Sequence, residues 1–258
     1  MQTEMLIAMD LVEVGQIDSS NALSTVENLS KALNLTTTSM SVVSHEHFRT
    51  SKNVAKFVEF LDRDNPKLLT LITHLRKQKT FRFGGGFASQ MVERSRFPVL
   101  VVDARALPVK SFSTVIFATD FSSHNHRAFD VAMTWAKDLD ADLIIFNALL
   151  GMPSQSVGSE SLAGGLEQID VYLRSERARA EESASRWESV ARSRGVRVST
   201  VLETSASTVP RALLKSALAH SADLIVMNSQ TSAKSSVFFG SITREVLRTG
   251  GLPVLVVN

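Results

Sequence analysis

The chain has 258 residues, which is enough for one large domain or two domains of ordinary size. Hydrophobic residues make up 44% and charged residues 21%, a balance that excludes a disordered or fibrous protein. The net charge of +2 predicts no nucleic acid and no membrane as a partner, and the lack of cysteine excludes disulfides and thiolate metal sites. Because neither a signal peptide nor an apolar run of about 18 residues is recognisable, we expect a cytoplasmic protein.

Strand and helix patterns alternate along the first part of the chain. Short apolar, β-branched runs predict buried strands, and apolar residues at intervals of three and four predict helices between them. The predicted elements are a strand at 5–11 that contains Asp10, a strand at 36–44, a helix at 53–64, a strand at 67–74, a helix that follows Gly85 and a strand at 98–102.

A short linker at 103–111, in which Pro108 breaks the pattern, leads into a second series of the same kind. The predicted elements here are strands at 114–121 (with Asp120 at its end), 141–150, 196–203, 222–229 and 253–257, a long charged helix near 165–194, a helix at 209–221 and a helix after Gly240. Alternating strands and helices predict parallel sheets covered on both faces.

The two series are copies of one unit. "FPVLVV" at 97–102 returns as "LPVLVV" at 252–257, and in both copies 13 positions separate a glycine from the proline of that run: Gly85 from Pro98, and Gly240 from Pro253. Asp10 lies 88 positions before Pro98, whereas Asp120 lies 133 before Pro253, so the first copy lacks 45 residues. We therefore predict a truncated domain of about four strands at 1–105 and a complete, five-stranded domain at 111–258.

In order and spacing, "VIFATDF", "ADLIVMN" and "GSITREVLRTGGLPVLVV" make the chain resemble a tandem universal stress protein. The resemblance implies a Rossmann-like sheet of strand order 3-2-1-4-5, association through the last strand and, in one branch of the family, ATP bound beside the first and fourth strands. It thus implies that 98–102 and 253–257 pair within the chain as a pseudo-dimer. A homodimer and an unidentified protein partner are further expectations.

The family's ATP signature consists of a glycine, two residues, a second glycine, nine residues, and then Gly followed by Ser or Thr. By this resemblance, the candidate nucleotide-binding residues are Ala118, Asp120, Asn228, Thr231, Gly240 and Ser241. Asn228 and Thr231 stand where the leading glycines are expected, and eight residues rather than nine precede Gly240. Since β-branched Thr resists positive φ, we expect no tightly bound ATP, no required cofactor and at most a small anion near Ser241.

Each candidate residue also has a purely structural interpretation. Asp120 could accept hydrogen bonds from the "FSSHN" turn, and Gly240 and Ser241 could simply begin a helix. Neither an activated nucleophile nor paired carboxylates nor a metal-ligand pattern is recognisable, so an enzyme is the less favoured interpretation. Three hypotheses remain: a nucleotide-binding stress regulator, a stress-responsive interaction protein without ATP, and an enzyme that reuses the crevice. We also expect a shallower crevice in the first copy.

Overall fold

The first half of the chain folds into alternating strands and helices. The computed structural model describes residues 4–10, 18–42, 51–73, 87–149, 162–204, 208–229, 241–249 and 251–258. Within the described part, the elements of this half are β1 (Met5–Asp10), α2 (Ser20–Ala32), β2 (Thr37–Val42), α3 (Ser51–Asp64), β3 (Leu68–Thr73), α4 (Phe87–Arg94) and β4 (Val99–Asp103). Helix α2 is an addition to the elements expected from the sequence, whereas the four strands agree with it.

The second half repeats this alternation with one more strand and one more helix. Its elements are β5 (Thr114–Ala118), the short 3-10 helix η2 (Ser123–Asn125), α5 (His126–Asp138), β6 (Asp142–Ala148), α6 (Leu162–Ser193), β7 (Val198–Glu203), α7 (Val209–Ala219), β8 (Leu224–Asn228), α8 (Ser241–Thr249) and β9 (Val254–Val257). Strand β5 ends two residues before Asp120, so the prediction that this strand extends to 121 was wrong. Asp120 instead lies in the turn that follows β5.

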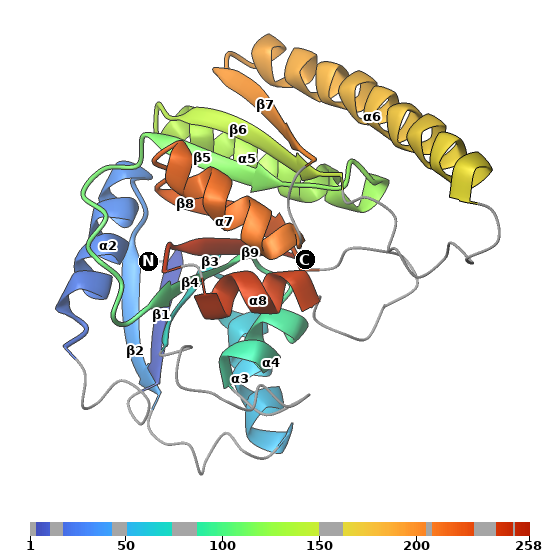
Figure 1. Ribbon diagram of the computed structural model, residues 1–258. Helices are drawn as coiled ribbons and strands as arrows, with labels where there is room; N and C mark the ends of the chain where they lie inside the picture. The colour runs from blue at the N-terminus through green and yellow to red at the C-terminus, as the bar shows by residue number, and fades with distance from the viewer. Residues whose placement is uncertain are drawn as a thin grey trace.

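All nine strands of the described residues form one sheet, in the order β2-β1-β3-β4-β9-β8-β5-β6-β7 (Figure 1). Counted within the second half, β7-β6-β5-β8-β9 is the order 3-2-1-4-5, and the first half contributes four strands in the order 2-1-3-4. The predicted fold class, with a complete second half and a truncated first half, is confirmed. The bounds 1–105 and 111–258 for separate domains stay a prediction.

The two halves meet at the antiparallel pair β4 and β9, whereas every other neighbouring pair of strands is parallel. In this pair Val99 lies opposite Val256 and Leu100 opposite Leu255. These four side chains are fully buried. Because β4 and β9 each have a neighbour on both sides, the open edges of the sheet are β2 and β7.

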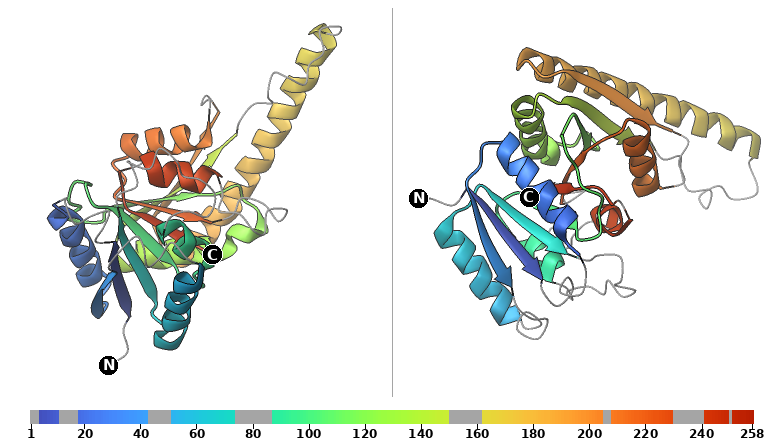
Figure 2. Two further views of the ribbon diagram at one scale, coloured as in Figure 1. Left: turned by 90° about the horizontal axis from the view of Figure 1, so that it is seen from below. Right: turned by 90° about the vertical axis from the view of Figure 1, so that its left-hand side faces the viewer.

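Helices cover both faces of the sheet and bury a separate apolar core on each. One core includes side chains of α2, α5 and α6, such as Leu29, Phe129 and Trp187. The other includes side chains of α3, α4, α7 and α8, such as Leu61, Met91 and Leu213. Figure 2 shows α6 running beyond the rest of the molecule at its N-terminal end. Corresponding helices of the two halves therefore lie on the same face.

Five helices of this chain are followed by a residue with positive φ. Asn34, Asn65, Asp140 and Ser221 follow α2, α3, α5 and α7 with φ between 50° and 52°, and Gly195 follows α6 with φ 79°. A residue in this left-handed conformation allows the last carbonyls of a helix to be satisfied before the chain turns into the next strand. Asn and Asp tolerate it better than other residues with a side chain, which explains their place here.

The connection between the halves is held against α2. The side-chain amide of Asn28 donates to the Val109 carbonyl at 3.0 Å, and the Val109 amide donates to Oγ1 of Thr25 at 3.0 Å. The predicted linker is thus packed along α2. In the part of the chain that the structure describes, no helix is long and apolar enough to cross a membrane.

Candidate functional site

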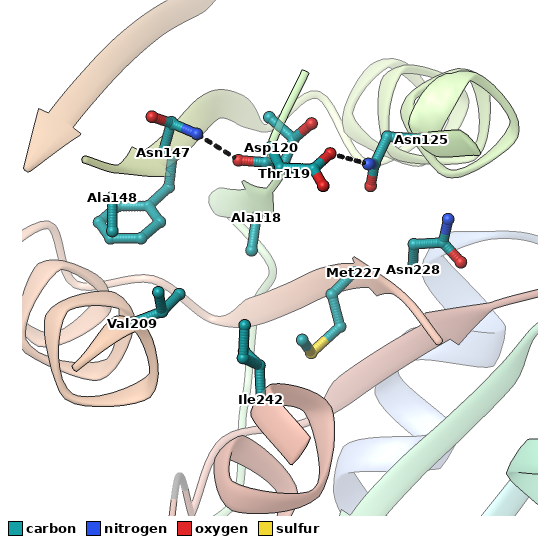
Figure 3. Close-up of a pocket in the computed structure, with 11 residues that line it drawn as sticks. Ala118, Thr119, Asp120, Asn125, Asn147, Ala148, Val209, Met227, Asn228 and Ile242 are labelled. Carbon is teal, nitrogen blue, oxygen red and sulfur yellow. Dashed lines mark hydrogen bonds between the residues drawn. The ribbon is translucent and has the colours of Figure 1, made fainter. Parts of the chain in front are cut away.

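A cavity of about 230 Å³ lies at the carboxyl ends of β5, β6 and β8 (Figure 3). The starts of α7 and α8 close it on the opposite side. It is lined by Ala118, Thr119, Asp120, Asn125, Phe146, Asn147, Ala148, Val209, Met227, Asn228 and Ile242. In an open parallel sheet this is the edge at which the strand order reverses and ligands usually bind, because the connections leave in opposite directions there.

Asp120 is held by the turn that follows β5. Its Oδ1 accepts hydrogen bonds from the Ser122 amide at 2.9 Å and from the side-chain amide of Asn125 at 2.6 Å. Asn125, which is 3% exposed, also donates to the Ser122 hydroxyl at 3.0 Å. Oδ1 of Asp120 therefore accepts hydrogen bonds from the turn, as the structural interpretation of this residue predicts. Oδ2 receives no hydrogen bond from the described residues.

Asn147 ties the ends of β5 and β6 together. Its side-chain amide donates to the Thr119 carbonyl at 2.8 Å, and the Thr119 amide donates to the Phe146 carbonyl at 2.9 Å. Asn147 is 7% exposed, and its Oδ1 is buried without a hydrogen-bond partner in the described part of the chain. An unpaired buried acceptor carries a desolvation cost, which this end of β6 bears.

Asn228 connects β8 to the turn before α5. Its side-chain amide donates to the His124 carbonyl at 2.7 Å, and its own carbonyl accepts from Oγ1 of Thr243 at 3.2 Å. Thr243 is fully buried in α8. These contacts explain an asparagine at this position without invoking a phosphate.

The Asp120 turn contains a bulky residue in a left-handed conformation. Phe121 has φ 59°, which is unusual for an aromatic residue. Its ring meets the Trp187 ring of α6 edge-on, with centroids 5.5 Å apart. Trp187 also stacks on Phe117 at 5.9 Å and lies 4.4 Å from the Phe129 ring. Aromatic packing against α6 thus holds the turn that positions Asp120.

The structure brings together three of the six predicted site residues: Ala118, Asp120 and Asn228 all line the cavity. Ser241 is the first residue of α8 and precedes Ile242, which lines it too. Thr231 and Gly240 lie outside the described residues, as do Asp10's side chain and the first-copy loop around Gly85. Asn125 and Asn147 were missed, although Asn125 belongs to the turn already quoted as a cap.

The electrostatics of the cavity are simple. Asp120 is the only ionisable side chain among the described lining residues, and no Lys, Arg or His accompanies it there. Across the described part of the chain, no group of three or more His, Asp or Glu side chains is arranged to hold a metal ion. The cavity is therefore an apolar chamber with one carboxylate and three side-chain amides on its rim.

Comparison with known proteins gives matches to a family model and to solved structures. The model of the universal stress protein family matches residues 111–258. A universal stress protein from Archaeoglobus fulgidus DSM 4304 is 17% identical, with a TM-score of 0.57, and the match covers 99% of this chain and 86% of that one. A functionally unknown protein from Pseudomonas aeruginosa PAO1 is 13% identical, with a TM-score of 0.57, over 99% and 92% of the two chains. No curated protein matches.

Proposed function

Because the chain belongs to the universal stress protein family, we propose that it serves the stress response as a tandem regulatory protein that acts through a protein partner and holds no ATP tightly. The observation that carries the proposal is the lining of the cavity, where a carboxylate faces the space and the described residues supply no cation. A triphosphate carries several negative charges, and the described lining offers no cation to offset them.

The start of α8 is the main feature that would attract an anion. Main-chain N–H groups at a helix start favour negative charge by about 0.3–1 kcal/mol. Each well-placed hydrogen bond to a charged phosphate is worth about 1.5–3 kcal/mol, and the family signature supplies several through its glycines. With Asn228 and Thr231 at the glycine positions, we expect these contacts to be largely lost. The helix start alone suffices for a small anion near Ser241.

Nucleotide binding by the purified protein tests this proposal. We expect no stoichiometric nucleotide to co-purify, and calorimetric titration with ATP, with and without magnesium, to give a dissociation constant of roughly millimolar or weaker. Replacing Asn228 and Thr231 by glycine and inserting one residue before Gly240 should strengthen binding. Stoichiometric co-purified ATP in the unaltered chain would contradict the proposal.

A second candidate is an adenine-nucleotide-binding regulator that uses the second half. The position of the cavity favours it, since Ala118, Asp120 and Asn228 meet at the edge where open α/β sheets bind ligands. This candidate predicts micromolar binding in the same titration. No catalytic role is proposed for any residue.

The partner surface must lie away from the last strands. Single-domain relatives are expected to associate through that strand, but here β4 and β9 already occupy each other's edges. We therefore propose that a homodimer, if formed, uses a different surface, and that the regulatory partner is a protein rather than a nucleic acid or a membrane. A cytoplasmic location stays a prediction from the sequence.

A further inference from the structure

The cavity beside Asp120 combines an apolar interior with one carboxylate. From this combination we propose that it binds a small molecule that carries a cationic amine or amidine on an apolar ring or chain. The inference rests on the proposed function above, because tightly held ATP would occupy the same cavity. The second half would then bind a cationic ligand, opposite in charge to ATP.

The interior of the cavity suits the apolar part of such a ligand. Phe146 and Met227 are 1% and 3% exposed and line it at the strand ends, and Ala148, Val209 and Ile242 add further apolar lining (Figure 3). An aromatic ring or short aliphatic chain placed among these side chains removes apolar surface from water, which is the usual source of affinity in small-molecule sites.

Asp120 suits the cationic head group. Its Oδ1 is saturated by the Ser122 amide and the Asn125 side chain, so the carboxylate is fixed in position. Oδ2 receives no hydrogen bond from the described residues, and Figure 3 shows the carboxylate at the rim of the cavity, between Thr119 and Asn125. A fixed carboxylate with one open oxygen pairs best with a charged N–H donor, since charge-assisted hydrogen bonds are roughly twice as strong as neutral ones.

The other polar groups of the cavity support the same sign of charge. One N–H of the Asn147 side-chain amide is bound by the Thr119 carbonyl, and its Oδ1 is buried out of reach of the cavity. One N–H of the Asn228 side-chain amide is likewise bound by the His124 carbonyl. The start of α8 offers main-chain N–H groups with about half a positive charge, spread over the first turn, against the full charge of Asp120. Asp120 has the only full charge among the described lining groups, so these groups favour a charged donor over an acceptor.

Three ligands of similar shape but different charge show how charge affects the affinity: benzamidine is cationic, benzamide neutral and benzoate anionic. Titration of the full chain, followed by NMR, should show benzamidine binding about tenfold more tightly than benzamide, which corresponds to about 1.4 kcal/mol. Benzoate should bind most weakly. Equal affinities, or benzoate as the tightest ligand, would overturn the inference.

Three substitutions test where the ligand binds. Asp120→Asn keeps the shape and an acceptor for Ser122, and it should remove the preference for benzamidine over benzamide. Asp138→Asn, at the exposed end of α5, removes the same charge away from the cavity and should preserve the preference. Ala148→Leu narrows the cavity and should weaken all three ligands. A preference that survives Asp120→Asn would also overturn the inference.

ATP, titrated in the same series, distinguishes the two proposals. If ATP binds with micromolar affinity, the proposed function fails. If neither ATP nor benzamidine binds, the function proposed above stands and this inference alone is wrong. If benzamidine binds and ATP does not, both are supported.

Discussion

The guanidinium of Arg127, at the start of α5, donates a hydrogen bond of 2.7 Å to the backbone carbonyl of Asn258, directly after β9. It also donates to the Arg96 carbonyl of the first half at 3.0 Å. Asn258 in turn donates through its side-chain amide to the Val92 carbonyl at 2.9 Å and to the Ser95 carbonyl. These contacts join two parts of the second half, the end of β9 and the start of α5, to the α4–β4 connection of the first half.

Arg127→Ala should lower the free energy of unfolding by about 1 kcal/mol, because two hydrogen bonds from a charged but largely exposed donor are lost. Urea denaturation followed by circular dichroism measures the change. Arg186→Ala is the matched control: Arg186 and Glu182 of α6 form an ion pair of 3.6 Å with side chains 68% and 70% exposed. This control should alter the free energy by less than about 0.5 kcal/mol. An equal effect of both substitutions would contradict the fastening role.

Unfolding of the two halves should be coupled through the β4–β9 pair. Leu100 of β4 is fully buried opposite Leu255 of β9, so Leu100→Ala should cost about 2–5 kcal/mol. The chain has two tryptophans, Trp135 and Trp187, and both belong to the second half. The substitution in the first half should therefore shift the tryptophan fluorescence transition as far as the circular dichroism transition. A shift in circular dichroism alone would mean that the halves unfold separately.

The two equivalent units were predictable from the repeat in the sequence, whereas the strand order 3-2-1-4-5 was implied by the resemblance to the universal stress protein family. The runs 97–102 and 252–257, with glycines 13 positions ahead, fix the ends of two equivalent units, and the missing 45 residues account for one strand and one helix. Helix α2 was harder to predict, since its N-cap residue Ser19 makes no side-chain cap bond and Thr25 and Ser30 interrupt its buried face. Its packing depends on Asn28 and Thr25 contacting Val109, which lies 81 to 84 positions away.

The site was predictable in part. Asp120 follows β5 and Asn228 ends β8, strands that the pattern locates, so both were expected at the crevice. Asn147 gives no such signal, because it lies within the apolar run 141–150 and becomes significant only when its side-chain amide meets the Thr119 carbonyl. The left-handed conformation of Phe121 was likewise beyond sequence reasoning, since nothing local favours it and its ring packs on Trp187, 66 positions away.

Glu4 should make stability depend on pH at the acidic end. Its carboxylate accepts hydrogen bonds from Lys67 at 2.6 Å and from the Thr36 amide at 3.2 Å, and these, the Lys67 bond first, lower the pKa of Glu4 below its ordinary value of 4.5. A carboxyl with a lowered pKa stabilises the fold above its ordinary pKa, and the contribution disappears as the pH falls through the folded value. The Glu4→Gln variant should therefore be less stable than the parent chain near neutral pH, with a difference that shrinks below pH 4.5. Urea midpoints across this range measure it, and a difference independent of pH would be the contrary result.

The left-handed backbone at Phe121 predicts an inverted order for two substitutions. Phe121→Ala loses the edge-on contact with Trp187 and should destabilise the chain by about 2 kcal/mol, while the strain of positive φ remains. Phe121→Gly loses the same contact but relieves the strain, so it should be more stable than the alanine variant by about 1 kcal/mol. Leu218 of α7 provides the control, since it is 82% exposed on a regular helix. Because Leu218 lies in the last turn of α7, glycine there should be less stable than alanine by less than the roughly 1 kcal/mol of a helix interior. Urea denaturation of the four variants gives both differences, and an alanine variant at 121 that is the more stable of its pair would show that the turn carrying Asp120 has another conformation in solution.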